Sequence, residues 1–359
     1  NLPINTWYKE KMIEKNSMPP LGILYIATYL QNNGFKVKVI DFSVEIIKLD
    51  EFKEMLVELN PKIIGMSTYN ETWEAQKTLC KIIKNINPNI LIISGGAFAT
   101  FCYEDILNQS LTDYIVRGEG EDTFLNLCKY IFSDKEKSDY PDFTGICYKD
   151  MDNNIVVNKE LIRIIDLDKL PFPNRDLIDI NKYTMPYTIS TSRGCPGNCI
   201  FCSSKSFWGH KVIMRSAKSV FEEVIYLHNR YGTNIFSIVD DTFTASKKRC
   251  NEFCDMIKNS GINFLWECES RADVIDDDFI RVLYDAGCHK IQFGMESADN
   301  NILKKLKKNV TVEQIESAVK YAYKYGMHIQ TSYIIGHAFD TEETIKKTIE
   351  FALEIKDSG

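Results

Sequence analysis

The most informative stretch of this chain reads Arg-Gly-Cys-Pro-Gly-Asn-Cys-Ile-Phe-Cys over residues 193–202. It follows residues 188–191, which we predict to form a short strand. Its glycine and proline residues favour a tight loop in which the thiols of Cys195, Cys199 and Cys202 converge. Thiolates are the usual ligands of iron–sulfur clusters, which normally take four. Three thiolates would therefore leave one iron open to bind a reactant.

Strand and helix patterns alternate on the C-terminal side of this loop. We predict strands at residues 188–191, 235–239, 264–268, 290–293 and 328–335, with helices between them and a last helix at 342–356. Five such units without closure predict a partial (β/α)6 barrel over residues 188–359, with a sixth strand expected beyond the end of this sequence. In such barrels, polar residues at the carboxyl ends of the strands usually face the reaction.

The N-terminal part shows the same alternation. Here we predict a first helix at residues 22–30 and strands at 37–40, 63–66, 90–93 and 114–116. The pattern predicts a Rossmann-like (flavodoxin-like), doubly wound parallel sheet over residues 1–132, with ligands beyond the carboxyl ends of its strands. Residues 133–187 break the rhythm with a polar run at 134–140, a hairpin pattern at 146–157 and Leu-Pro-Phe-Pro at 170–173. We predict a linker with a β-hairpin there.

Composition excludes several classes of protein. The 359 residues, 44% of them hydrophobic, suit about two globular domains, and a net charge of -7 argues against nucleic-acid binding. The longest nearly apolar stretch, residues 90–101, is too short to span a membrane. No export signal is visible, so the 11 cysteines indicate a reducing cytoplasm. Because the chain starts at Asn1 and ends on a helical pattern, we expect it to be part of a longer protein.

The cysteine spacing, with an aromatic residue before the last cysteine, resembles that of the radical S-adenosylmethionine (SAM) superfamily. Asp-Asp-Thr-Phe-Thr at 240–244, Glu-Ser-Arg-Ala-Asp at 269–273 and Gly-Met-Glu-Ser at 294–297 resemble its barrel motifs. The resemblance implies a catalytic 4Fe-4S cluster on Cys195, Cys199 and Cys202. It implies SAM contacts for Phe201, Asp240, Asp241, Arg271, Glu296, Ser297 and Gly336, with Arg271 at the SAM carboxylate and Glu296 at the ribose or methionyl end.

One run departs from that family. Where its members often read Gly-Leu-Pro-Gly-Glu-Thr after the fifth strand, this chain has Gly-His-Ala-Phe-Asp-Thr at residues 336–341. Gly336 would still let adenine approach the backbone. His337 is either a hydrogen-bonded structural residue or an acid or base aimed at substrate.

The N-terminal part resembles the cobalamin-binding domains that are fused to radical SAM barrels. The similar runs are Pro-Pro-Leu-Gly at 19–22, Gly-Met-Ser-Thr-Tyr at 65–69, Ser-Gly-Gly at 94–96 and Val-Arg-Gly-Glu-Gly-Glu at 116–121. The resemblance implies that cobalamin contacts Ser67, Thr68, Ser94, Gly95, Gly96, Glu119 and Gly120. The corrinoid motif Asp-x-His-x-x-Gly is absent, so no histidine from that motif would reach the cobalt. The alternative is a domain that keeps the fold without cobalamin.

Together, these resemblances imply a cobalamin-dependent radical SAM enzyme. It would cleave SAM reductively to a 5′-deoxyadenosyl radical and methylate an unactivated carbon of a small molecule or peptide. An electron donor such as flavodoxin or ferredoxin is the implied partner. The rival hypotheses are a radical cyclisation or ring rearrangement without methyl transfer, a methylthiotransferase, and a sensor of cobalamin or redox state that catalyses nothing.

Three further patterns have plainer alternatives. The cysteine loop is compatible with a zinc knuckle completed by His210, or with chance clustering. Cys250 and Cys254 lie four residues apart on a predicted helix, and we interpret them as buried or incidental thiols. The lysine-rich run at residues 304–308 predicts a solvated helix face.

Overall fold

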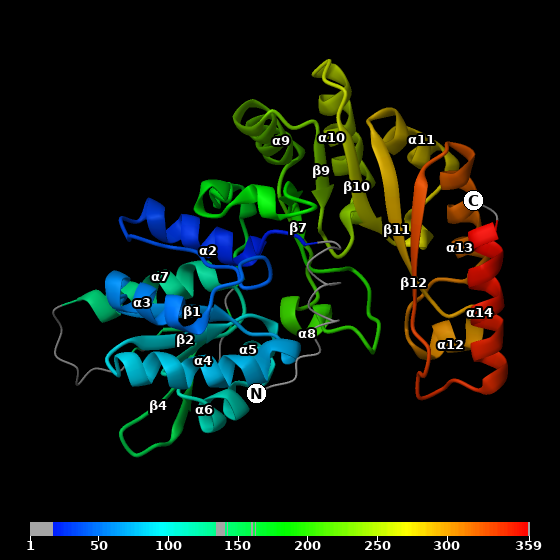
Figure 1. Cartoon of the computed structure of the whole chain (residues 1–359). Coiled ribbons are helices and arrows are strands. Elements are labelled where there is room, and N and C mark those ends of the chain that lie inside the picture. The colour runs from blue at the N-terminus through cyan, green and yellow to red at the C-terminus, as the bar shows by residue number, and fades with distance from the viewer. Residues whose placement is uncertain (1–16, 134–140, 142, 159–160, 162, 358–359) are drawn as a thin grey trace. The chain divides into compact units, whose positions relative to one another are not determined.

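The computed structural model describes residues 17–133, 141, 143–158, 161 and 163–357, so the predicted polar run at 134–140 lies outside it. The chain divides into two compact units. Unit 1 comprises residues 1–165 and 170–183, and unit 2 comprises residues 166–169 and 184–359. In Figure 1 the colours from blue to green follow unit 1, and the colours from green to red follow most of unit 2.

Unit 1 is built on a five-stranded sheet in the order β1-β2-β3-β4-β5. Its strands are β1 (Ile63–Ser67), β2 (Leu91–Gly95), β3 (Tyr114–Val116), β4 (Ile146–Lys149) and β5 (Ile155–Val157). Its helices are α2 (Leu21–Asn32), α3 (Leu49–Leu59), α4 (Trp73–Ile86), α5 (Ala97–Phe101), α6 (Tyr103–Gln109) and α7 (Gly120–Phe132). β1, β2 and β3 are parallel, whereas β4 and β5 form an antiparallel hairpin.

Helices cover both faces of this sheet. On β2, Ile92 packs in a cluster with Cys80 and Ile83 of α4, whereas its neighbour Ile93 packs with Leu127 of α7. Successive strand residues point to opposite faces, so a strand with two adjacent buried isoleucines must have cover on both sides. The doubly wound architecture predicted from the alternation is confirmed.

Two segments of unit 1 differ from the sequence-based expectations. Residues 37–40, predicted to be a strand, have no regular structure; Val39 packs instead on Leu24 and Ala27 of α2. An apolar run can be buried by packing without pairing its backbone. The predicted hairpin is present, and it continues the sheet through antiparallel pairing of β4 with β3, so this part of the predicted linker belongs to unit 1.

Unit 2 has a parallel sheet in the order β12-β11-β10-β9-β6. Its strands are β6 (Thr188–Ile189), β9 (Ile235–Ile238), β10 (Leu265–Ser270), β11 (Cys288–Glu296) and β12 (His328–Tyr333). The helices are α8 (Ser204–Trp208), α9 (Ala217–Tyr231), α10 (Lys247–Asn259), α11 (Asp277–Asp285), α12 (Asn300–Lys305), α13 (Val312–Lys324) and α14 (Glu342–Asp357). A short antiparallel pair, β7 (Ser192–Arg193) with β8 (Ile213–Met214), was not predicted. The five predicted parallel strands are confirmed.

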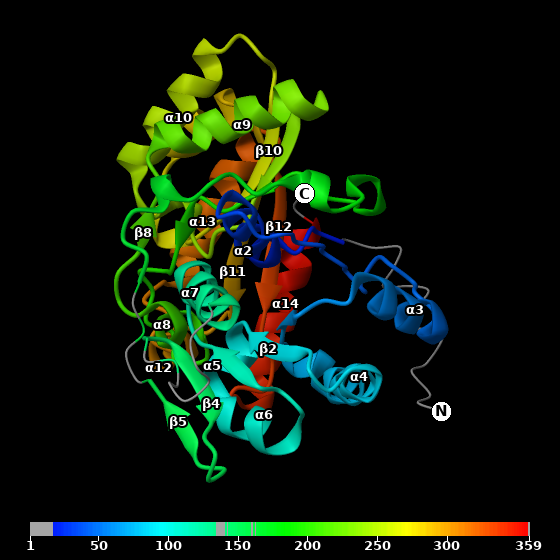
Figure 2. The same ribbon diagram turned by 90° about the vertical axis from the view of Figure 1, so that its left-hand side faces the viewer.

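The core of unit 2 is aromatic between its sheet and its first helices. Trp266 on β10 is fully buried, stacks on Phe236 at 6.1 Å between ring centroids, and donates its indole N–H to the Ala286 carbonyl at 2.8 Å. Figure 2 shows α9 and α10 running side by side over this part of the sheet. A glycine is required at 287, where φ is +89° and a Cβ would lie 2.0 Å from the Phe264 carbonyl oxygen.

Candidate functional site

The three cysteines of the 193–202 stretch lie in the loop between β7 and α8. Cys195, Cys199 and Cys202 line one small pocket together with Gly197, Ser204 and Lys205. Two backbone amides point at sulfur atoms: Gly197 N–H donates to Cys195 Sγ at 3.3 Å, and Ser204 N–H donates to Cys202 Sγ at 3.4 Å. N–H donors favour the thiolate over the thiol, so the loop is suited to hold sulfur as an anionic ligand.

The space beside Gly197 tests whether the loop suits a cluster. A Cβ at this position would lie 3.3 Å from Cys195 Sγ, 3.8 Å from Cys199 Sγ and 2.9 Å from Arg271 Nη1. The missing side chain therefore keeps the space between two thiols and a guanidinium open. Among the described residues, no three His, Cys, Asp or Glu side chains are arranged to hold a single metal ion. Three thiols around one pocket, with space left open at Gly197, match the donor set that an iron–sulfur cluster requires.

Two cations face the thiols. Burial raises the pKa of Cys199, and the charges of Lys308 and Arg271 oppose that shift. These two positive charges therefore stabilise negative charge on the thiols. His210, the proposed fourth ligand of a zinc knuckle, is not among the residues that line the pocket.

Asp240 and Asp241, at the carboxyl end of β9, hold the two ends of the cysteine loop. Asp240 is buried and accepts hydrogen bonds from the amides of Thr191 at 2.6 Å and Ser192 at 3.0 Å, as well as from both hydroxyl groups. Asp241 accepts from the Ser204 hydroxyl, at the start of α8. In the structure their partners are the residues that flank the loop, and the SAM contact assigned to both aspartates stays a prediction.

Thr242 and Arg249 complete this arrangement. The Thr242 hydroxyl lies 3.2 Å from Cys195 Sγ. Arg249 on α10 donates to the Thr191 carbonyl at 2.9 Å, and its guanidinium lies 3.8 Å from Asp240. Burial raises the pKa of Asp240, and Arg249 and the loop donors oppose that shift. Neither Thr242 nor Arg249 was singled out from the sequence, although Thr242 directly follows the two aspartates.

Arg271 follows β10 and is held from two sides. Its Nε and Nη2 donate to the two carboxylate oxygens of Asp273, each at 2.9 Å, and Nη2 also donates to the Lys308 carbonyl at 2.8 Å. Nη1 has no hydrogen bond within the described residues and is the nitrogen nearest the open space at Gly197. A guanidinium fixed in this way presents one free donor edge to the thiol pocket.

Glu296, at the end of β11, is buried and has a φ of +66°. Its Oε1 lies 2.9 Å from Lys308 Nζ, and both side chains are 9% exposed. A solvated helix face was predicted for residues 304–308, and for Lys308 this is wrong. Lys304, Lys305 and Lys307 are exposed as predicted. The lysine run itself does not reveal which lysine turns inward, because this depends on the loop conformation after α12.

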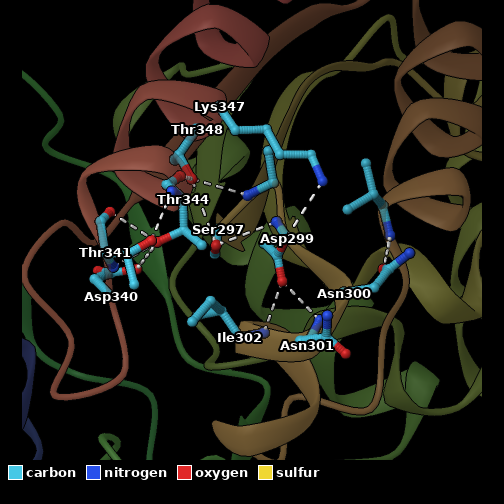
Figure 3. A network of polar contacts seen from close by, with 12 residues as sticks. Ser297, Asp299, Asn300, Asn301, Ile302, Asp340, Thr341, Thr344, Lys347 and Thr348 are labelled. Atoms are coloured by element: carbon cyan, nitrogen blue, oxygen red, sulfur yellow. Dashed lines mark hydrogen bonds and ion pairs between the residues drawn. The ribbon is translucent and has the colours of Figure 1, made fainter.

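Ser297 lies in a polar network between the β11–α12 connection and α14 (Figure 3). Its hydroxyl accepts from the Asp299 amide at 3.2 Å and lies 3.4 Å from the Thr348 hydroxyl, which accepts from the Ala298 amide at 3.1 Å. The SAM contact assigned to Ser297 stays a prediction. The contacts observed here are structural, since they fix the turn that follows Glu296.

Gly336 and His337 form a turn held by Asp340. Both backbone amides donate to Asp340 Oδ2, at 3.0 and 2.9 Å, and Gly336 has a φ of +94°. The His337 ring lies 5.7 Å from the Phe201 ring between centroids. His337 Nε2 is buried without a hydrogen-bond partner among the described residues. This nitrogen therefore does not make the structural hydrogen bond that one of the two predictions for His337 required.

In unit 1, four of the predicted cobalamin contacts gather where β1 and β2 end. Ser67 pairs with Gly95, and the Thr68 amide donates to the Gly95 carbonyl at 2.8 Å. Gly96 has a φ of +91°, and a Cβ there would lie 3.2 Å from Ser67 Oγ. Thr68 Oγ1 is buried with no hydrogen-bond partner among the described residues. An unpaired buried hydroxyl beside a crowded glycine fits a polar group approaching this strand end.

The other three predicted cobalamin contacts have protein partners. Ser94 is fully buried and accepts from Gln76 Nε2 at 2.8 Å. Glu119 accepts from Arg163 Nε at 3.0 Å and from a backbone amide of the same segment. Gly120 begins α7 where a Cβ would lie 2.7 Å from Ile26 of α2. These contacts account for the three residues within unit 1, and their role in cobalamin binding stays a prediction.

Each of the two units matches a family of known proteins. Residues 15–128 match the family model described as "B12 binding domain", and residues 189–352 match the one described as "Radical SAM superfamily". The protein named uncharacterized methyltransferase PH0819, from Pyrococcus horikoshii, is 34% identical over 351 residues, which are 96% of this chain and 75% of that one. The chain belongs to the cobalamin-binding radical SAM family. Its resemblance to that family, inferred from the sequence, is confirmed.

Other relatives extend this result. The anaerobic magnesium-protoporphyrin IX monomethyl ester cyclase of Rubrivivax gelatinosus is 30% identical over 93% of this chain and 62% of its own. The structure of OxsB, with aqua-cobalamin and SAM bound, has a TM-score of 0.80 at 20% identity over 95% of this chain. The structure of TsrM from Kitasatospora setae, with tryptophan and a SAM analogue bound, has a TM-score of 0.78 at 17% identity over 94% of it. At these identities the two structures confirm the fold.

These proteins are longer than this chain. The chain spans half the length of the OxsB chain, 68% of the TsrM chain and 62% of the cyclase. Each unit matches one family model, a B12-binding domain in unit 1 and a radical SAM domain in unit 2. Within the described residues, no helix has the length and apolarity required to cross a bilayer.

Proposed function

We propose that this chain is a cobalamin-dependent radical SAM enzyme that methylates an unactivated carbon. The observation that carries the proposal is the pocket lined by Cys195, Cys199 and Cys202, with the free edge of Arg271 beside it. Three thiols give a cluster three ligands, and a fixed guanidinium beside them offers a partner for a carboxylate. The relative PH0819, named as a methyltransferase, supports the type of reaction.

Each residue has a role in this proposal. The three cysteines hold the cluster, Arg271 Nη1 binds the SAM carboxylate, and Phe201 lies against adenine. When bound, the cluster supplies the electron that breaks a carbon–sulfur bond of SAM, and cobalamin carries the methyl group. Gly197 keeps the space at the thiols open. Asp240 and Asp241 hold the loop that carries the ligands, so they act on the site through the cysteines.

In unit 1, the end of β1 and β2 is the proposed cobalamin contact. Thr68 Oγ1 offers an unpaired hydroxyl, and Gly96 allows close approach of a ligand to the backbone. We include Ser67 and Gly95 in the same contact because they lie in register at the ends of neighbouring strands. A small molecule or peptide as substrate, a flavodoxin or ferredoxin as electron donor, and a cytoplasmic location complete the proposal.

A second candidate function is a radical cyclisation without net methyl transfer. The observation that favours it is the 30% identity to the Rubrivivax gelatinosus protein named as a cyclase. Both functions begin with SAM cleavage, and they differ in the fate of the methyl group of a second SAM. A methyltransferase converts that SAM to S-adenosylhomocysteine while remethylating reduced cobalamin, whereas a cyclase does not.

The test uses the full chain, reconstituted anaerobically with iron, sulfide and cobalamin and supplied with SAM and a chemical reductant. We expect 5′-deoxyadenosine and, for the methyltransferase, S-adenosylhomocysteine with methylcobalamin. The variant Cys199→Ser is expected to abolish 5′-deoxyadenosine formation, whereas Cys102→Ser, in unit 1, is the matched control and is expected to retain it. Stoichiometric zinc in place of iron, or no SAM cleavage by an iron-loaded protein, would refute the proposal.

A further inference from the structure

Lys308 lies in the connection between α12 and α13 and is 8% exposed. Its ammonium group lies 2.9 Å from Glu296 Oε1, at the end of β11. Removing an ammonium group from water costs free energy unless a charged partner compensates it, so a lysine is rarely buried for packing alone. The ion pair lies over Gly294, where a Cβ would be 2.6 Å from Glu296 Oε1 and 2.9 Å from Lys308 Nζ.

The backbone around Lys308 has an uncommon conformation. Its two neighbours, Lys307 and Asn309, both have a φ of +55°, in the left-handed region that residues other than glycine seldom adopt. The Lys308 amide donates to the Leu303 carbonyl at 3.0 Å. The Lys308 carbonyl accepts from Arg271 Nη2 at 2.8 Å. This conformation directs the carbonyl toward Arg271 while the side chain reaches Glu296.

The same connection contacts the cysteine loop. Ile200, between two of the cysteines, donates its amide to the Leu306 carbonyl at 3.0 Å. Within a few residues, the chain after α12 therefore contacts the cysteine loop, Arg271 and Glu296. These three parts of unit 2 come from different βα units, and the connection around Lys308 joins them.

We propose that Lys308 is a positioning residue for SAM, holding the Arg271 guanidinium through its carbonyl and the Glu296 carboxylate through its ammonium group. The inference rests on the proposed function, in which Arg271 binds SAM, and on the SAM contact that the family resemblance implies for Glu296. Lys308 does not itself touch the reacting atoms in this role. It orients the Arg271 guanidinium and the Glu296 carboxylate. Arg271 is then available to the SAM carboxylate, and Glu296 is available to the ribose or methionyl end of the same molecule.

The test is equilibrium binding of radiolabelled SAM to the full chain, reconstituted anaerobically and matched for iron content. We compare wild type with Lys308→Met and with Lys304→Met, an exposed lysine of the same run that serves as the matched control. Lys308→Met is expected to raise the dissociation constant for SAM tenfold or more. Lys304→Met is expected to leave it within twofold of wild type.

A second variant covers the case in which Lys308→Met does not fold. Gly294→Ala keeps both charges and places a methyl group against the terminal atoms of Glu296 and Lys308, so that the side chains of the ion pair must shift. It is expected to weaken SAM binding at least fivefold while lowering the unfolding temperature less than Lys308→Met does. Lys308→Arg, which keeps the charge, is expected to bind SAM more tightly than Lys308→Met.

The outcomes separate the two proposals. If wild-type protein binds SAM and both Lys308→Met and Gly294→Ala bind it equally well, the role of Lys308 is refuted and the proposed function stands. A lower unfolding temperature with an unchanged dissociation constant would also refute it, because a merely structural lysine behaves in that way. If the iron-loaded wild type does not bind SAM, the proposed function fails, and the role of Lys308 fails with it.

Discussion

Replacing Asp240 with Asn tests whether this carboxylate fixes the cysteine loop. Asn keeps the shape and an oxygen for the amides of Thr191 and Ser192, but it removes the negative charge 3.8 Å from Arg249. Breaking a buried ion pair by removing one partner costs about 3 to 5 kcal/mol. The pair here is long, so we expect a loss of about 3 kcal/mol, at the lower end of that range.

Hydrogen exchange measured by mass spectrometry reports this loss of stability at the backbone amides of the loop. Because about 1.4 kcal/mol is a tenfold change in an equilibrium constant, 3 kcal/mol predicts roughly hundredfold faster exchange of the Thr191 and Ser192 amides. Asp241→Asn is the matched control, since Asp241 is exposed and accepts from one hydroxyl, and it should change exchange at these amides less than fivefold. Unchanged exchange in Asp240→Asn, together with normal iron uptake, would refute the role of Asp240.

Three further changes have defined outcomes. Gly197→Ala places a methyl group 3.3 Å from Cys195 Sγ and 2.9 Å from an Arg271 nitrogen, so iron and sulfide analysis should show reduced cluster loading at an unchanged unfolding temperature. Gly120→Ala creates a 2.7 Å contact with the terminal carbon of Ile26, which can shift, so it should destabilise unit 1 by about 1 kcal/mol, seen in denaturant unfolding. Burial opposes the ionised form of Asp299, but hydrogen bonds from two backbone amides and a lysine outweigh it and lower its pKa. Its stabilising contribution is therefore complete above the ordinary aspartate pKa and is lost as pH falls through the lowered value, so Asp299→Ala should flatten the acid dependence of the melting temperature below about pH 4.

The sequence predicts the architecture well because both units follow a strict alternation of strands and helices. The five parallel strands of unit 2 were expected from this alternation, and the run at 146–157 correctly indicated a hairpin. Residues 37–40 were mispredicted because an apolar run indicates burial and not pairing, and Val39 is buried in a cluster with Leu24 and Ala27 of α2. The pairing of β4 with β3 is a tertiary contact with no local pattern.

The cysteine ligands of the site could be predicted from the sequence, whereas the contacts that hold the cysteine loop in place could not. Three cysteines at close spacing carry their chemistry in the local sequence, and they do line one pocket. Asp240 was identified as a site residue, but its partners are 48 and 49 residues away, so its structural contacts had no local pattern. Lys308 was assigned to solvent because the four lysines of residues 304–308 look alike in the sequence, and only the left-handed turn after α12 distinguishes it.

The supports around the cysteine loop suggest why it is built from polar contacts. Asp240 holds the chain before the loop, Asp241 holds the start of α8 after it, and Leu306 accepts the Ile200 amide in its middle. A loop fixed at both ends and its centre loses less conformational freedom when it takes up a ligand, so more of the binding free energy is retained. Apolar packing would give the same rigidity but would fill the space beside Gly197 that a cluster needs. Polar anchoring outside the pocket leaves that space open.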